Sequence, residues 1–118
     1  MTYKDLMIAR LTFQQMVEKL EVKAREQGLY IVRSYCQRSE HEQKYLVEIK
    51  ASKTMNSRHI QALAQDYVLM DDLLEYREVT DSDDPRWHIL GEFWEDLGGT
   101  WGGSWGWDSG HFEFWPFD

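Results

Sequence analysis

The spacing of apolar residues predicts a long amphipathic helix at the start of the chain. In "YKDLMIARLTFQQMVEKLEVKAREQG", residues 3–28, apolar side chains return every three or four positions, as they do on one face of a helix. Gly28 provides a natural end for this helix. The face that we expect to be buried consists of Leu6, Ala9, Phe13, Met16, Val17 and Leu20.

Four later segments have the pattern of strands. Residues 29–35 ("LYIVRSY") are β-branched and aromatic, and residues 63–70 ("LAQDYVLM") form an apolar run typical of a buried strand. Residues 75–84 indicate a loop or hairpin with a short strand, and residues 111–115 ("HFEFW") alternate as a final strand would.

Two further helices are predicted between these strands. Residues 39–50 begin with a capping-box pattern, in which Ser39 is followed three positions later by Glu42. Pro85 opens a helix over residues 85–98, with proline at the first position and glycine at the end. This order of helices and strands predicts an α+β fold, in which a small antiparallel sheet is flanked by helices.

Composition is consistent with one small domain. The chain has 118 residues, 42% of them apolar, which suits a single core over residues 1–118. It contains no run of eighteen apolar residues, so we expect no membrane span. The charged N-terminus lacks the features of a secretory signal, so we expect synthesis in the cytoplasm. The single Cys36 excludes an internal disulfide and a four-cysteine zinc site.

The net charge of −8 is unevenly distributed along the chain. Residues 1–60 hold eleven Lys and Arg against seven Asp and Glu, whereas residues 61–118 hold two against fourteen. An acidic second half argues against nucleic acid as a partner, because phosphates need a basic face. The "DSDD" run at 81–84 is expected to be a solvated surface, with cation binding as the alternative.

Two of the four histidines have a carboxylate at a short spacing. Asp66 follows His59 by seven residues, and Asp108 precedes His111 by three. Both separations are odd, and on a straight strand they would put the two side chains on opposite faces. Each pair can therefore meet only where the chain bends between its members.

Together these residues suggest a zinc site, although their spacing leaves another interpretation open. Two histidines and one carboxylate suit catalytic zinc, whose fourth position is taken by water, and a further carboxylate is the usual general base. The alternative is that these are ordinary structural residues, because two His and two Asp occur in most chains of this size. We expect His41 to be a surface residue and His88 to be structural.

Three stretches, taken together, carry a resemblance to a known family. They are "YCQRSEHEQ" (35–43), "SRHIQALAQD" (57–66) and "WGGSWGWDSGHF" (101–112). They resemble the arginine segment, the SxHxxGxAxD motif and the WGGxW…DxPHF motif of the zinc D-alanyl-D-alanine carboxypeptidase family. This family includes VanX-like and VanY-like D,D-peptidases and the L-alanyl-D-glutamate peptidases of phage endolysins. The three motifs occur in the family's order, and the resemblance extends from about residue 13 to 114.

The resemblance implies a catalytic role for five residues. His59, Asp66 and His111 would hold Zn²⁺. Asp108 would take a proton from the metal-bound water and pass it to the leaving amine, and Arg38 would polarise the scissile carbonyl and stabilise the oxyanion. It also implies a hedgehog-like or D,D-peptidase-like fold with the zinc at the sheet.

The resemblance further implies substrate contacts and a biological role. Ser57, Trp101 and Trp105 are the candidates for substrate binding. The alternatives are that Ser57 supports the ligand loop and that the tryptophans are core residues. The WGGxW style favours an L-alanyl-D-glutamate endopeptidase that cuts peptidoglycan stem peptides. We expect a monomer without nucleic-acid or membrane partners, which acts on the cell wall, with release by a holin as one route. The alternatives are a D,D-carboxypeptidase or dipeptidase, a non-catalytic wall-binding module and a structural zinc domain.

Four positions depart from the family pattern. Ala62 stands where the family usually has glycine, which costs about 1 kcal/mol if the turn needs a positive φ. Gly110 replaces the usual proline and is expected to loosen the approach to the last histidine. Ser104 replaces a common aspartate, and Gln65 is polar where an apolar residue is usual.

Overall fold

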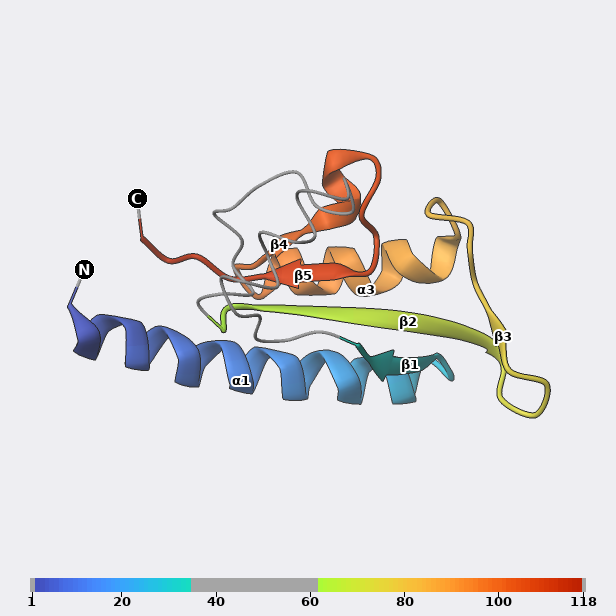
Figure 1. Cartoon of the computed structure of the whole chain (residues 1–118), viewed down its shortest axis with the longest axis horizontal. Coiled ribbons are helices and arrows are strands. Elements are labelled where there is room, and N and C mark those ends of the chain that lie inside the picture. The colour runs from blue at the N-terminus through green and yellow to red at the C-terminus, as the bar shows by residue number, and fades with distance from the viewer. Residues whose placement is uncertain (1, 35–61, 118) are drawn as a thin grey trace, which may run out of the picture.

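The computed structural model describes residues 2–34 and 62–117, and in these the chain combines two α-helices with one antiparallel sheet (Figure 1). The predicted helix 39–50 and Cys36 lie outside the described residues. The α+β prediction is confirmed. In chain order the elements are α1 (Tyr3–Glu26), β1 (Tyr30–Arg33), β2 (Ala64–Asp72), β3 (Arg77–Glu78), α3 (Pro85–Asp96), β4 (Thr100–Trp101), the 3₁₀ helix η1 (Gly102–Trp105) and β5 (His111–Glu113).

Helix α1 begins at a capping box and buries the face that the sequence predicts. The Thr2 hydroxyl accepts the N–H of Asp5 at 3.1 Å, and the Asp5 carboxylate accepts the N–H of Thr2 at 2.9 Å. Gly28, with φ 68°, reverses the chain after the last turn. The buried residues of α1 are Ala9, Phe13, Met16, Val17, Leu20 and Ala24, while Leu6 is partly buried.

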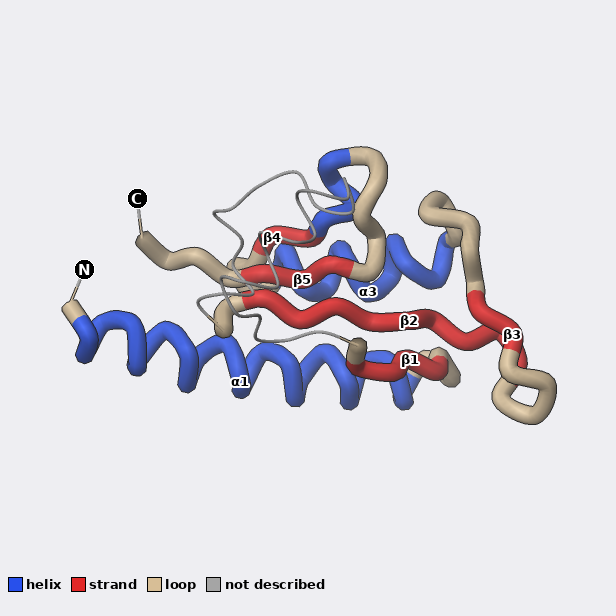
Figure 2. Tube along the Cα trace, viewed as in Figure 1, coloured by secondary structure: helices blue, strands red, loops and turns tan. Residues whose placement is uncertain are grey.

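The sheet has the order β1-β2-β5-β4, and every described pair is antiparallel (Figure 2). The long strand β2 is the central strand of the sheet, because it pairs with β1, β3 and β5. Helices α1 and α3 contact each other and run along the direction of β2 (Figure 1). No helix in the described ranges is both long and apolar enough to span a membrane.

Alternation along β2 and β5 separates the sheet into two chemically different faces. Leu63, Tyr67, Leu69 and Phe112 belong to the buried cluster that also holds the inner residues of α1 and α3. Phe112 touches Trp94 of α3 edge-on, with ring centroids 5.7 Å apart. Because successive side chains of a strand point to opposite faces, the residues between these face away from the helices.

The acidic run of residues 81–84, which precedes α3, is partly exposed to solvent and also stabilises the start of this helix. Asp84 caps the helix, because its carboxylate accepts the N–H of Arg86 at 2.9 Å. The Arg86 guanidinium also binds Asp84 and reaches Asp71 of β2 at 2.9 Å. The side-chain hydrogen bond from Arg86 lowers the pKa of Asp84 to about 2. Asp83 is exposed, as a solvated surface predicts.

Strand β4 and helix η1 were not expected from the sequence. Their segment is rich in glycine and tryptophan and is too short to show periodicity. Trp101 closes the sheet edge by pairing with Phe112, and its ring occupies the space beside Gly91 and Gly103. A Cβ at either glycine would lie 2.1 Å from a Trp101 ring carbon, so glycine is required for this packing.

One side-chain network joins α1, β1 and β2. The Glu21 carboxylate accepts hydrogen bonds from Arg33 at 2.6 and 2.9 Å and from the Tyr67 hydroxyl at 2.6 Å. Partial burial raises the pKa of Glu21, but these hydrogen bonds outweigh it and hold the pKa below its ordinary value. Burial, and then the bond to Glu21, raise the pKa of Tyr67. The network therefore stabilises the fold only while Glu21 is ionised.

We predict that Glu21→Gln lowers the free energy of unfolding by about 1–2 kcal/mol at pH 7, because charged hydrogen bonds are lost from a partly buried site. The folded-state pKa of Glu21 is depressed, so its stabilisation is present above the unfolded value near 4.5 and is lost as the pH falls through the folded value. Urea unfolding at pH 7 and at acidic pH measures this. Glu18→Gln, on the exposed side of α1, is the control. An equal loss in both variants, or an unaltered acid dependence, would contradict the prediction.

We predict that Ala62→Gly raises the free energy of unfolding by about 0.5–1 kcal/mol. Ala62 has φ 57°, so the turn before β2 does need the left-handed conformation, which costs alanine about 1 kcal/mol. Part of the gain is offset by the greater freedom of glycine in the unfolded chain. Ala9→Gly, within α1, should have the opposite sign, with a loss of about 1 kcal/mol. Chemical unfolding at one pH compares the two, and a loss for Ala62→Gly would overturn the expectation.

Candidate functional site

The register between β2 and β5 brings two predicted site residues together. Asp66 and His111 are direct cross-strand partners on the face of the sheet that points away from α1 and α3. The Asp66 Oδ1 and His111 Nδ1 atoms lie 3.0 Å apart. The two side chains are 45 positions apart in sequence, and strand pairing alone places them in contact.

Both ring nitrogens of His111 face carboxylates. Nδ1 lies against Asp66, and Nε2 lies 2.8 Å from Oε1 of Glu113. Burial lowers the pKa of His111, but the hydrogen bonds to Asp66 and Glu113 outweigh it and raise the pKa to about 9. Without a metal the ring is therefore a cation that donates to both carboxylates, and a metal at Nδ1 would have to replace that proton.

Asp108 lies next to this pair on the loop between η1 and β5. Its Oδ2 atom is 4.0 Å from His111 Nδ1, and about a third of its side chain is exposed. The loop closes on itself, because the N–H of His111 donates to the carbonyl of Asp108 at 3.1 Å. The bend that the sequence predicts between Asp108 and His111 is thus present, and it brings their side chains close together.

Trp101 supports this loop from the protein interior. Only 4% of Trp101 is exposed, and its indole N–H donates to the carbonyl of Ser109 at 2.7 Å. The Ser109 hydroxyl in turn donates to the carbonyl of Ser82, ahead of α3. His88, expected to be structural, packs its ring edge-on against Trp101 at 5.1 Å. Trp101 thus has the core position that was the alternative to a substrate contact.

Trp105 occupies the open side of the site. Its ring centroid lies 5.2 Å from that of His111, with the planes inclined by 39°. Trp107 lies 5.9 Å from Trp105, and both are roughly half exposed. The two rings therefore form an apolar surface beside His111 that a ligand can reach from solvent.

Three predicted site residues, Arg38, Ser57 and His59, lie outside the described residues. Within residues 2–34 and 62–117, no group of three or more His, Cys, Asp or Glu side chains is arranged to hold a metal ion. The described part thus supplies two of the three expected ligands, Asp66 and His111, and the expected base, Asp108.

The donor atoms of Asp66 and His111 are of a kind that suits a zinc ion. Two ligands of a tetrahedral zinc, each about 2.0–2.1 Å from it, are separated by about 3.3 Å. The observed 3.0 Å between Oδ1 and Nδ1 is a few tenths of an ångström shorter. One carboxylate oxygen and one imidazole nitrogen are also donors of the type that zinc prefers.

Glu113 is a site residue that the sequence reasoning missed. Its side chain is mostly buried and bonds directly to His111. The available signal was its spacing, because residues two apart on a strand point to the same face. Once residues 111–115 are read as a strand and His111 as a ligand, Glu113 follows as its neighbour.

The departures from the family pattern leave the observed contacts intact. The amide of Gln65 is buried and donates to the carbonyl of Asp66 at 2.9 Å. The Ser104 hydroxyl donates to Glu95 on the surface of α3. Gly110 permits a close approach, because a Cβ there would lie 2.6 Å from the carbonyl oxygen of Tyr67. Its own carbonyl accepts the Tyr67 N–H at 2.8 Å, which ties the loop to β2.

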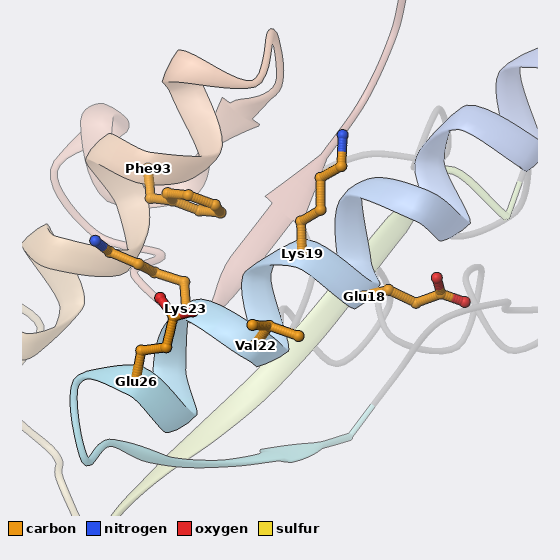
Figure 3. A pocket seen from close by; sticks show the side chains of 6 residues that line it. All are labelled: Glu18, Lys19, Val22, Lys23, Glu26 and Phe93. Carbon is orange, nitrogen blue, oxygen red and sulfur yellow. The ribbon is translucent and has the colours of Figure 1, made fainter.

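A separate groove runs between α1 and α3 (Figure 3). In it the ammonium of Lys23 lies 5.6 Å from the ring centroid of Phe93. The groove contains none of the predicted site residues, and its lining consists of Glu18, Lys19, Val22, Lys23, Glu26 and Phe93.

Comparison with known proteins places this site in a family context. The family model described as D-alanyl-D-alanine carboxypeptidase matches residues 50–114, a range that includes Asp66, Asp108 and His111. No curated protein sequence matches the chain. Among solved structures, the fold is similar to that of the Serratia marcescens L-Ala D-Glu endopeptidase ChiX. The two are 23% identical with a TM-score of 0.67, over 86% of this chain and 79% of that one.

The family match covers more than half of the sequence, and it spans the two strands and the loop that carry the described site. The similar solved structure independently supports the same α+β architecture. The chain belongs to the D-alanyl-D-alanine carboxypeptidase family of peptidases.

Proposed function

We propose that this protein is a zinc-dependent peptidase that hydrolyses peptidoglycan stem peptides between L-alanine and D-glutamate. The observation that carries the proposal is the convergence of Asp66, His111 and Asp108 on one face of the sheet, within the family match. Zinc is the metal that the family resemblance implies, and the donor pair fits it. The choice of bond is supported by the WGGxW-like segment and by the similarity of the fold to that of the L-Ala D-Glu endopeptidase ChiX.

In this mechanism Asp66 and His111, together with His59, would hold the metal. When bound, zinc would lower the pKa of a water ligand to about 7 and polarise the scissile carbonyl. Asp108 would accept the proton of the attacking water, a role supported by the 4.0 Å between its Oδ2 and Nδ1 of His111 and by the exposure of about a third of its side chain. The same carboxyl group would then deliver the proton to the leaving amine. Arg38 is assigned to the developing oxyanion.

The aromatic surface beside His111 suits a peptide substrate. Trp105 and Trp107 are roughly half exposed next to the site, so they can cover the apolar parts of a stem peptide and limit water around the reacting bond. Ser57 remains a candidate for substrate binding from outside the described residues. We assign Trp101 an indirect role, because its indole N–H holds the loop of Asp108 in place.

A second function, D,D-carboxypeptidase or dipeptidase, is favoured by one specific observation. The matching family model is described as D-alanyl-D-alanine carboxypeptidase. The same metal site and base would serve this reaction, and only the substrate pocket would differ. The products of hydrolysis therefore distinguish the two functions.

The first test is digestion of peptidoglycan by purified protein with and without a zinc chelator, with mass spectrometry of the soluble products. We expect peptides with a new N-terminal D-glutamate that disappear on chelation and return with zinc. Asp108→Ala should reduce their formation by at least about 10²-fold, the usual contribution of a general base. Asp83→Ala, at an exposed aspartate before α3, is the matched control and should retain activity.

Other products would change the conclusion in defined ways. Release of D-alanine would establish the carboxypeptidase function instead. No product from a folded, zinc-loaded sample would favour a non-catalytic wall-binding module, for which the exposed Trp105 and Trp107 would be the contact surface. Full activity in Asp108→Ala would exclude the proposed mechanism.

Gly102 provides a second test, because it packs against the loop between η1 and β5 that carries Asp108. A Cβ on Gly102 would lie 2.2 Å from the carbonyl oxygen of Asp108 and 2.9 Å from the Cβ of His111. Gly102→Ala must therefore push the loop away from η1, and a displacement near 1 Å can cost about 10²-fold in rate. We predict a loss of turnover of at least about 10-fold in samples that remain folded.

The control for this variant is Gly28→Ala. Gly28, unlike Gly102, has a positive φ, but a Cβ there would meet nothing within 4 Å, and the residue lies at the end of α1. It should lower the free energy of unfolding by about 1 kcal/mol and leave turnover within about two-fold of the original. Thermal melting and stem-peptide turnover, measured together, separate loss of geometry from loss of stability. Unchanged turnover in Gly102→Ala would mean that the loop position does not matter.

A further inference from the structure

The environment of His111 contains a contact that the proposed reaction does not use. His111 has two ring nitrogens, and only Nδ1 faces Asp66, where the proposed metal would bind. The other nitrogen, Nε2, is directed at the carboxylate of Glu113 at 2.8 Å. A metal-binding histidine presents a lone pair at one nitrogen and a proton at the other, and the partner of the second nitrogen decides which is which.

We infer that Glu113 is the positioning residue of the metal site: its carboxylate accepts the Nε2–H of His111 and so holds the ring with Nδ1 turned toward Asp66 and the metal. This inference rests on the proposed zinc site. It adds a residue outside the five to which the family resemblance gives a catalytic or metal-binding role.

The backbone of Glu113 is fixed by contacts on both sides of its strand. Strand β5 lies between β2 and β4, and Glu113 has a partner on each side, Ala64 and Thr100. Its carbonyl also accepts the indole N–H of the fully buried Trp94 at 2.8 Å. The side chain is only 16% exposed. The carboxylate therefore starts from a rigid, largely dehydrated position, which makes its hydrogen bond directional and strong.

The other contacts that the described residues make with His111 do not fix the ring by themselves. Trp105 covers the ring at 5.2 Å between centroids, which limits tilting but does not distinguish Nδ1 from Nε2. Asp66 would be a metal ligand on the Nδ1 side, so its oxygen would be directed to the metal instead of to the ring. Of the contacts described, the one to Glu113 is the one that survives metal binding and specifies the orientation.

The test compares Glu113→Ala with Glu113→Gln in the full-length protein. Glutamine retains an oxygen that can accept the Nε2–H, whereas alanine removes it. Zinc affinity is measured by competition with a chromophoric chelator. We expect Glu113→Ala to weaken zinc binding by about 10–100-fold, and Glu113→Gln to recover most of that loss. Thermal melting of both variants without metal controls for folding.

A spectroscopic measurement separates positioning from general stability. In zinc-loaded protein with ¹⁵N-labelled histidine, His111 should show a metal-bound Nδ1 and a protonated, slowly exchanging Nε2–H. The slowly exchanging proton should be retained in Glu113→Gln and lost in Glu113→Ala. A purely structural role for Glu113 would lower the melting temperature without altering which nitrogen binds zinc.

The outcomes for this inference and for the proposed function are distinct. If the original protein binds no zinc, the proposed function fails at the metal, and the inference fails with it. If it binds zinc and hydrolyses stem peptides, but Glu113→Ala has the same affinity and retains the Nε2–H signal, the inference alone is wrong. Loss of affinity in Glu113→Ala without recovery in Glu113→Gln would also overturn it, because the acceptor oxygen would then not be the relevant feature.

Discussion

The antiparallel register between β2 and β5 is the constraint on which the site depends. It sets Asp66 opposite His111, and by alternation it sends Gln65 and Phe112 to the face that packs on the helices. A slip of one residue would turn the carboxylate and imidazole into the core and expose the large apolar side chains. The buried Phe112 packs between Tyr67, Trp87 and Trp94. This packing therefore stabilises the register that holds Asp66 opposite His111, as well as the core. Core packing and site assembly are two consequences of the same pairing.

The tryptophans and glycines near the C-terminus extend this constraint to the loop of Asp108. Trp101 continues the core under the loop and binds its backbone, while Gly102 lets the same loop approach η1. The segment has little regular structure of its own, so its shape comes from packing on α3 and β5. The Trp101 ring, which packs beneath this loop, therefore helps to hold Asp108, the proposed base, in position.

Much of this arrangement could be predicted from the sequence, and the exceptions have physical reasons. The periodicity of residues 3–28, the capping pattern at Pro85 and the strand composition at 63–70 are local signals, and all three elements are confirmed. Strand β4 is two residues long and exists because Trp101 pairs with Phe112, which no local pattern reveals. The contact of Asp66 with His111 was expected from a family motif, but its cause is the β2–β5 register, a long-range property. Glu113 was missed because one glutamate in an acidic half carries no signal until its strand and its neighbour are known.

Protonation of the His111 ring explains how this buried histidine can have three carboxylates around it. His111 faces Asp66 and Glu113 at hydrogen-bond distance and Asp108 at 4.0 Å, which is an excess of negative charge for one ring. In the metal-free protein the ring stays protonated, and its pKa of about 9 expresses that excess. A divalent cation at Nδ1 would replace one proton with two positive charges, and so would neutralise the cluster more completely than the proton does. The carboxylates that stabilise the imidazolium are thus the groups that would also stabilise a cation bound at Nδ1 in the proposed reaction.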